Sequence, residues 1–226
     1  MANCLLLDHD VEVPLEVRTL DDFRRWAQSN GFPETGRIDF IRGNIEIDMS
    51  AENAFTHGTP KTAIVARLWT IADEHNLGDV FSDCMRISSP VADLSCEPDV
   101  IFVSHEAIDS GRVKLIKQKE GKHDDFVEIE GAPDIVVEIV SKNSVGKDTE
   151  RLPPAYFKAG VREFWLVDAR GEELLFVIHG RGQRRFEVLP RDEDGFQSSA
   201  VFRSRFRLDR TRDRPDHWRY NLVVEE

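Results

Sequence analysis

The stretch GAPDIVVEIVS, residues 131–141, decides the fold, because it is an apolar run with one acid, Glu138, near its middle. Such a run is typical of a strand in the centre of a sheet, where both faces are covered. Strand alternation places Glu138 on the face of Asp134 and Val136, and the odd-numbered Ile and Val residues on the other face. Burying a carboxylate among Val and Ile is costly unless it is paired or coordinates a cation.

A second acid stands at the start of another apolar strand, EPDVIFVS, residues 97–104. If this strand lies beside 134–141, Asp99 and Glu138 converge on one hard cation, and oxygen ligands suit Mg²⁺ or Mn²⁺. A structural alternative pairs Glu138 with an arginine from the C-terminal part of the chain and leaves Asp99 to cap a turn after Pro98. These residues alone are compatible with both interpretations.

The remaining elements alternate between helices and strands. TLDDFRRWAQSN (19–30) begins with a Thr cap and is followed by a Gly stop, which predicts a short amphipathic helix. RIDFIRGNIEIDMS (37–50) alternates apolar and polar residues around Gly43-Asn44, as a two-residue hairpin turn requires. Further strands are expected at 79–89, 161–169, 173–180 and in short pieces beyond 181, with a longer helix at 60–75 and a helix ending at YFKAG (156–160).

Length and composition indicate one ordinary globular domain, with 226 residues, 40% hydrophobic and 32% charged. Because the apolar runs are too short to span a membrane and the first residues lack a basic signal start, we expect a cytoplasmic protein without a membrane segment. The three cysteines, Cys4, Cys84 and Cys96, form no CxxC pair, so we expect them to be reduced.

Charge and the absence of other motifs narrow the chemistry. The net charge of −12 opposes tight autonomous binding to DNA, although a carboxylate site stays acidic until a cation fills it. The sequence contains neither GxxxxGK[ST] nor GxGxxG, and Ser141 lacks a nucleophile-elbow setting. Nucleotide hydrolysis and acyl transfer are therefore not favoured.

Several strings occur in an order that matches a known family. EPDVIFVS, GAPDIVVEIVS, the Lys147-Asp148 pair, Tyr156 and AGVREFWLVD (159–168) together resemble the Uma-type restriction endonuclease family of the PD-(D/E)XK superfamily. The resemblance spans 36–180. It implies an α/β fold with a restriction-endonuclease-like core, in which helices flank a mixed central sheet. Around this core (36–180), the residue pattern predicts an N-terminal helical segment (1–35) and a C-terminal β appendage of the same domain (181–226).

The resemblance also implies a chemistry, which is divalent-metal-dependent hydrolysis of DNA. In such enzymes two motif carboxylates, here Asp99 and Glu138, bind Mg²⁺ or Mn²⁺ and a lysine orients or deprotonates the attacking water. The family places a polar residue of its early helix near the metal. At that point this chain has His57, in THG (56–58), where a Glu is more usual. Glu46 and Asp48, on the preceding strand, are weaker candidates.

The lysine departs from the expected pattern. Val140 occupies the position two residues after Glu138, and Leu152 occupies the alternative position four residues before Tyr156. Lys142 shares the strand parity of Glu138 and is our candidate, whereas Lys147 and Arg151 are alternatives. Because Pro153-Pro154 would break a helix interior, we expect the next helix to begin there and the side chains before it to lie in a loop.

Two functions follow from these observations. The first is a metal-dependent DNA endonuclease that acts as a homodimer, since two symmetric sites cut both strands of a duplex most simply. The second is a catalytically weakened module of the same fold that binds nucleic acid or a protein. The displaced lysine and the net charge of −12 motivate the second hypothesis, and the retained Asp99 and Glu138 support the first.

Overall fold

The computed structural model describes residues 4–6, 11–83, 85–118, 125–214 and 217–225. The helices are α1 (Leu20–Ala27), α2 (Thr59–Glu74), α3 (His105–Asp109) and α4 (Leu152–Ala159). Two π-helical turns, Ala54–Gly58 and Lys147–Arg151, lead directly into α2 and α4.

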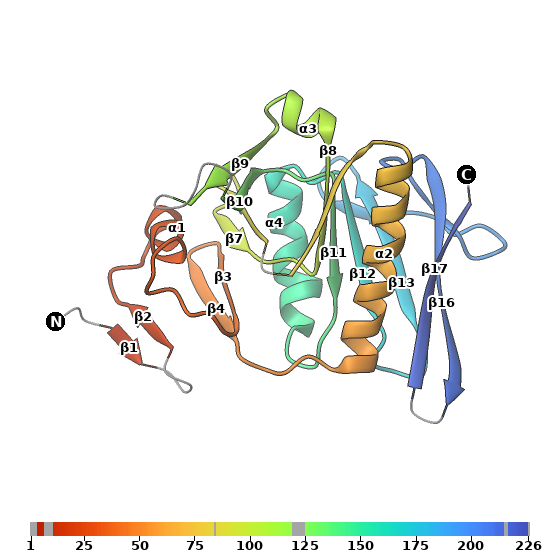
Figure 1. Ribbon diagram of the computed structural model, residues 1–226, viewed down its shortest axis with the longest axis horizontal. Coiled ribbons are helices and arrows are strands. Elements are labelled where there is room, and N and C mark those ends of the chain that lie inside the picture. Colours follow the sequence, from red (N-terminus) through yellow and green to blue (C-terminus); the bar gives the residue numbers. More distant parts are fainter. Residues whose placement is uncertain (1–3, 7–10, 84, 119–124, 215–216, 226) are drawn as a thin grey trace.

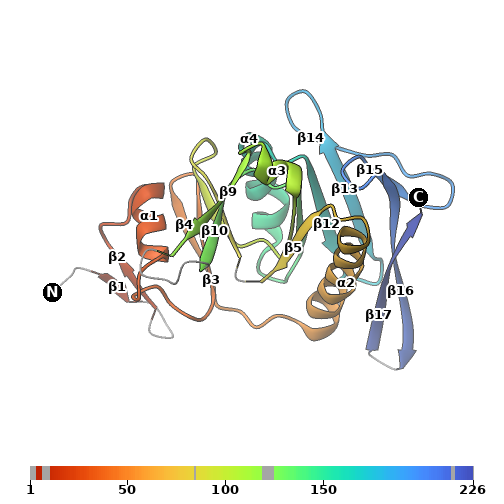
Figure 2. The same cartoon turned by 45° about the horizontal axis from the view of Figure 1, so that its top comes forward.

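Two six-stranded sheets carry the fold (Figures 1 and 2). The central sheet has the order β14 (Phe186–Val188), β13 (Leu175–Arg181), β12 (Glu163–Asp168), β11 (Ile135–Ile139), β8 (Val100–Ser104) and β5 (Gly78–Ser82). The second sheet has the order β4 (Asn44–Asp48), β3 (Arg37–Ile41), β7 (Leu94–Cys96), β6 (Arg86–Ser89), β10 (Phe126–Gly131) and β9 (Val113–Lys117). The predicted mixed α/β architecture is confirmed.

Strand β11 lies in the middle of the central sheet, parallel to β12 and antiparallel to β8. Helix α2 covers one face of this sheet and α4 the other (Figure 1). Val136 and Val140 pack in one cluster with α4, and the odd-numbered residues of β11 pack in another cluster with α2. The alternation predicted for this strand is therefore confirmed, and the face of Glu138 is the face of α4.

Local sequence signals explain the first helix and the hairpin. At the start of α1, Thr19 and Asp22 form a reciprocal capping box. The hairpin turn consists of Arg42 and Gly43, whose φ angles are 51° and 85°, and Ile41 pairs with Asn44. The expected turn at Gly43-Asn44 is thus displaced by one residue, because a turn with two positive φ angles favours glycine at its second central position.

The start of the helix before Tyr156 differs from the prediction. The π-helical turn Lys147–Arg151 precedes α4, and Pro153 and Pro154 lie in the first turn of α4, where no backbone donor is needed. The residues before the prolines are therefore helical and do not form a loop. As a consequence Lys147 and Asp148 are buried.

The two ends of the chain add further strands. Two short strands, β1 (Cys4–Leu6) and β2 (Glu12–Pro14), pair antiparallel in the segment where only a helix was expected. At the other end β15 (Gln197–Ser199), β16 (Ser204–Arg214) and β17 (His217–Glu225) form a three-stranded sheet. The β16–β17 ribbon lies along α2 (Figure 1), and Phe206 and Leu222 enter the apolar cluster beneath that helix.

Two smaller expectations concern cysteines and membranes. Cys4 and Cys96 are free thiols, and Cys84 lies outside the described residues. Within the described part of the chain, none of the helices combines the length and the apolar character that a membrane span needs.

Candidate active site

The two predicted carboxylates come together at one end of the β8–β11 pair. Val100 pairs with Val137 in antiparallel register, so Asp99 lies next to Glu138 across the strands. Asp99 is fully buried, and its Oδ2 accepts the backbone N–H of Ile139 at 2.7 Å. The predicted adjacency of the two strands is confirmed.

Three cations surround Asp99. Its carboxylate lies 3.0 Å from Arg37 Nη2 on β3, 3.4 Å from His57 Nε2 and 3.4 Å from Lys61 Nζ on α2. Burial raises the pKa of Asp99, but the contacts with His57 and the charges of Arg37 and Lys61 outweigh it and lower the pKa below its ordinary value. Asp99 is therefore ionised, and protein cations neutralise it.

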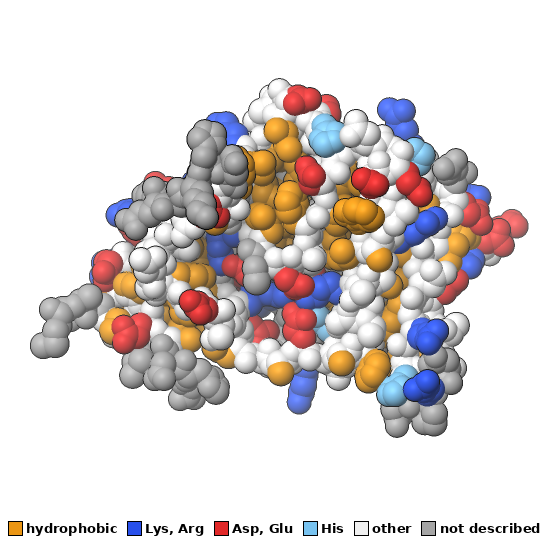
Figure 3. Space-filling view, in the orientation of Figure 1, with side chains coloured by type: hydrophobic (Ala, Val, Ile, Leu, Met, Phe, Trp, Pro, Cys, Tyr) orange, Lys and Arg blue, Asp and Glu red, His pale blue; other side chains and the backbone are white. Residues whose placement is uncertain are grey.

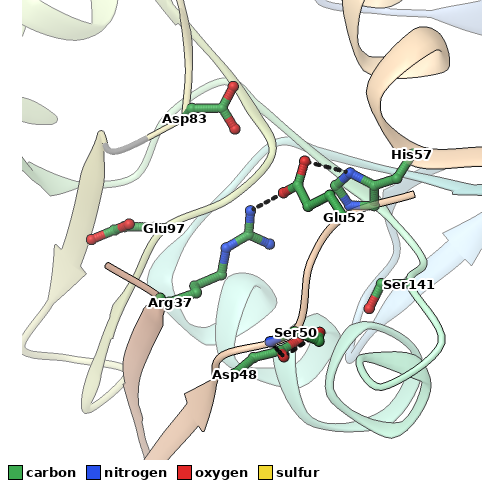
Figure 4. A pocket seen from close by; sticks show the side chains of 9 residues that line it. Arg37, Asp48, Ser50, Glu52, His57, Asp83, Glu97 and Ser141 are labelled. Carbon is green, nitrogen blue, oxygen red and sulfur yellow. Dashed lines mark hydrogen bonds and ion pairs between the residues drawn. The ribbon is translucent and has the colours of Figure 1, made fainter. Parts of the chain in front are cut away.

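His57 links Asp99 to Glu52, and Figure 4 draws the contact between His57 and Glu52. The imidazole is only 2% exposed, and its Nδ1 lies 3.1 Å from Glu52 Oε2. Burial lowers the pKa of His57, but its contacts with Asp99 and Glu52 raise it to about 9. The contact with His57 is in turn the largest cause that lowers the pKa of Glu52 to about 2. Ligand atoms of these three side chains lie within 4.8 Å of one another, so the group could hold a metal ion.

Glu138 has an oxygen without a partner. The hydroxyl of Tyr156 donates to Oε1, whereas Oε2 is buried and has no hydrogen-bond partner among the described residues. Burial and the nearby charges of Asp148 and Asp99 raise the pKa of Glu138 well above its ordinary value. A buried hydrogen-bond acceptor without a donor is rare in folded proteins. The unpartnered oxygen beside Asp99 fits the donor set of a hard divalent cation.

A buried lysine lies in the same cluster. Lys147 Nζ is 3.0 Å from Asp39 Oδ2, and Asp39 Oδ1 accepts the backbone N–H of Glu97 at 3.1 Å. Burial lowers the pKa of Lys147, but the charges of Asp39, Glu138 and Asp148 raise it above its ordinary value. Lys147 is therefore a cation that points into the carboxylate cluster.

The other sequence candidates lie at the edge of this cluster or outside it. Lys142 is exposed, so the structure does not bring it together with Asp99 and Glu138. Glu46 pairs through both oxygens with Arg151, at 2.6 and 2.8 Å. Asp48 lines the pocket beside Arg37, with its side chain accepting from Ser50 (Figure 4).

A cleft runs between the β3–β4 hairpin and the segment around Ser141. One part of about 230 Å³ is lined by Arg37, Glu52 and His57, and an adjoining part of about 520 Å³ is lined by Arg37, Asp39 and Lys147. Figure 3 shows acidic and basic side chains gathered around a hollow in this face of the molecule. The cleft has room for a phosphodiester and its water, and its lining includes the acids Asp39, Asp48 and Glu52, whereas Asp99 and Glu138 are buried and do not line it.

Sequence reasoning missed several members of the cluster, although the sequence pattern around two of them indicates a buried position. Asp39 is an acid between apolar Ile38 and Phe40 in a strand, which is the same signal that identified Glu138. Lys61 lies three residues before Ile64 and so on the buried face of α2. No comparable pattern surrounds Arg37 or Glu52, because only contacts between segments distant in the sequence bring these side chains to the site.

Comparisons with known proteins agree with the fold. The family model described as "Uma2: Putative restriction endonuclease" matches residues 20–211. The crystal structure of a putative nuclease belonging to DUF820 from Anabaena variabilis is similar, with a TM-score of 0.59 and 20% identity over 82% of this chain and 90% of that chain. A search of curated proteins found no match.

Proposed function

Because the chain belongs to the Uma2 family of putative restriction endonucleases, we propose that it is a divalent-metal-dependent endonuclease that hydrolyses phosphodiester bonds of DNA. One observation carries this proposal. Asp99 and Glu138 are both buried at adjacent strand ends, and Glu138 keeps an unpartnered oxygen there. Burying the Glu138 carboxylate with an unpartnered oxygen is costly, and a bound cation would offset that cost.

Asp99 and Glu138 would hold the metal, and His57 and Glu52 would flank it. The carboxylate oxygens suit Mg²⁺ or Mn²⁺. Such an ion would polarise the scissile phosphate and lower the pKa of a water molecule.

Two cations of the chain have separate tasks in this proposal. Arg37 lines both parts of the cleft, so its planar guanidinium can donate to a phosphate oxygen while it stays charged. Lys147 is held by Asp39 next to the carboxylates. Because the pKa of Lys147 is raised, its ammonium acts as a hydrogen-bond donor that orients water or stabilises charge, and does not act as a base.

The choice of lysine separates two versions of the proposal. Lys142 has the strand parity of Glu138, but it is exposed and would have to bend back over the strand. Lys147 is buried, and the charge of Glu138 is one of the causes that raise its pKa. These observations favour Lys147, and Lys142 is the assignment against which it is tested.

One observation favours the weakened module as a second candidate. Arg37, His57 and Lys61 already neutralise Asp99, so the native fold of the described residues does not require a metal there. The positions where a motif lysine is expected are Val140 and Leu152, and both are apolar.

Cleavage of supercoiled plasmid across a titration of Mg²⁺ and of Mn²⁺ tests the two candidates. We expect the parent to nick or linearise the plasmid only with metal, and Glu138→Ala to be inactive. Glu163→Gln is the matched control, because Glu163 is a buried strand acid bonded to Trp165 and Ser199 and separate from the site. DNA binding by the parent without cleavage at any metal concentration would favour the weakened module.

The homodimer expected from the sequence belongs to the same proposal. Two symmetric sites would convert plasmid directly to the linear form, whereas one site would accumulate the nicked form. Sedimentation of the protein with and without duplex DNA measures the number of copies.

A further inference from the structure

The β16–β17 ribbon is basic in a chain that is otherwise acidic. Residues 204–225, which span the ribbon, contain six Arg, three Asp and one Glu, a formal charge of +2. Since the whole chain has a formal charge of −12, the remaining residues together have −14. A polyanion approaching this protein is therefore repelled by most of the chain and attracted to the ribbon.

The arginines of the ribbon differ in what they contact. Arg205 pairs with Asp192 at 2.7 Å and Arg207 with Asp209 at 2.7 Å, so these cations are neutralised within the protein. Arg212 and Arg214, at the tip, are exposed and form no ion pair with any residue that the structure describes. Cations available to a partner are therefore found at the tip.

The tip is held in place by packing and hydrogen bonds. The ring of Trp218 lies between two guanidinium groups, with Arg210 at 4.1 Å and Arg212 at 4.2 Å from the ring centroid. Arg210 in turn donates to the backbone carbonyls of Ala169 and Gly171 at 3.2 and 3.0 Å. Such stacking fixes the side chains at low entropic cost, so Arg212 is preorganised for binding.

The tip also lies beside the candidate active site. The ring of His217 stacks on Phe55, with centroids 4.7 Å apart and planes at 28°. Phe55 belongs to the same π-helical turn as His57, and His57 Nε2 is 3.4 Å from Asp99. In Figure 1 the free end of the ribbon and the start of α2 lie at the same edge of the molecule.

From this juxtaposition we infer that the ribbon tip, defined by Arg212, Arg214 and Trp218, binds the sugar-phosphate backbone of duplex DNA next to the scissile bond. The inference deepens the proposed function and rests on it. Arginines beside a catalytic cleft fit phosphate oxygens through paired N–H donors. They position the duplex without reading its sequence. The exposed arginines of the ribbon thus give a chain of net charge −12 a place to bind the DNA backbone.

Fluorescence anisotropy with a labelled 30-base-pair duplex in EDTA, a length chosen to exceed the footprint, measures binding without cleavage. We expect the double variant R212A/R214A to bind about tenfold or more weakly, and to reduce the slope of log K against log salt by about 2. R212K/R214K should keep the slope of the parent, because the charges remain, and should lose part of the affinity, because lysine lacks the paired donors and the stacking on Trp218. The matched control is R184A/R185A, which removes two exposed arginines from the turn between β13 and β14 and should retain the parent's affinity and slope.

The outcomes separate this inference from the proposed function. Binding by R212A/R214A that equals the parent, or an equal loss in R184A/R185A, overturns the ribbon as the docking surface, even if the parent cleaves plasmid. Loss of binding confined to R212A/R214A supports the ribbon even if the parent cleaves nothing, and then only the nuclease proposal fails. Displacement of the parent's DNA by polyglutamate, with no effect of R212A/R214A on the duplex, would instead indicate an acidic protein partner.

Discussion

Replacing Glu138 by glutamine should stabilise the metal-free protein while it removes a metal ligand. The side chain is 1% exposed, and only one of its two oxygens has a partner, the hydroxyl of Tyr156. Glutamine keeps the shape and the oxygen that accepts from Tyr156. It removes a negative charge that burial and the charges of Asp148 and Asp99 disfavour. Glu138→Gln should therefore raise the free energy of unfolding while it weakens metal binding.

Both the magnitude and the pH dependence follow from the removed charge, because the amide nitrogen of glutamine takes the place of the unpartnered oxygen and is itself unpartnered there. Each pKa unit by which burial and neighbouring charges disfavour the carboxylate corresponds to about 1.4 kcal/mol, so we expect a gain of about 1–3 kcal/mol in the free energy of unfolding at pH 8. The pKa of Glu138 in the folded protein is raised above 4.5. The stability that the protonated Glu138 contributes is therefore fully present below pH 4.5. This contribution is lost as the pH rises through the pKa of Glu138 in the folded protein. Glutamine does not titrate, so the gain should shrink toward zero as the pH falls below 4.5.

Thermal or urea unfolding in EDTA, followed by tryptophan fluorescence, measures this effect. For a chain of this size each 1 kcal/mol shifts the melting temperature by about 2–4 °C. Glu163→Gln is the control, because both oxygens of Glu163 accept hydrogen bonds, from Ala200 N–H at 2.7 Å and from the hydroxyl of Ser199 at 2.8 Å. That variant should be destabilised. A Glu138→Gln protein less stable than the parent at pH 8 would refute the reasoning.

Three further predictions concern the cations of the cluster. Lys147→Met should lower the cleavage rate by about 10²–10⁴-fold, and Lys142→Met should not change it; the reverse result would support the choice of Lys142. Arg37→Met should tighten Mn²⁺ binding about tenfold, because the guanidinium no longer competes with the ion for Asp99. Calorimetry should show this as a gain of ~1.4 kcal/mol in binding free energy, and an unchanged affinity would show that Arg37 does not compete. Asp39→Asn leaves the buried ammonium of Lys147 without its anion, so urea unfolding should show a loss of about 3–5 kcal/mol, and a loss below 1 kcal/mol would contradict that pairing.

The central strands and their carboxylates could be predicted because local patterns determine them. Alternation along 134–141 places Glu138 on the α4 face, and the apolar run of 100–104 predicts the neighbouring strand that begins after Asp99. The capping box at Thr19 and the left-handed Gly160, with a φ of 104°, likewise follow from single residues. These features depend on short segments, which the sequence shows directly.

The cations around Asp99 could not be predicted in the same way. Arg37, Lys61 and Lys147 come from a strand, a helix and a π-helical turn that only the tertiary fold brings together. The prolines suggested a helix start at 153, but the π-helical turn before them satisfies the backbone and turns Lys147 inward. Strand parity therefore selected Lys142, a residue that the fold leaves exposed.

Calorimetric titration of Mn²⁺ into the parent, Asp99→Ala and Glu138→Ala proteins tests the central claim most directly, because it measures the site without requiring turnover. The paired carboxylates predict one binding event in the parent and its loss in both variants, since a lone acid holds a hard cation weakly. Binding of Mn²⁺ by Asp99→Ala and Glu138→Ala with the affinity of the parent would contradict the assignment of the metal to these two residues.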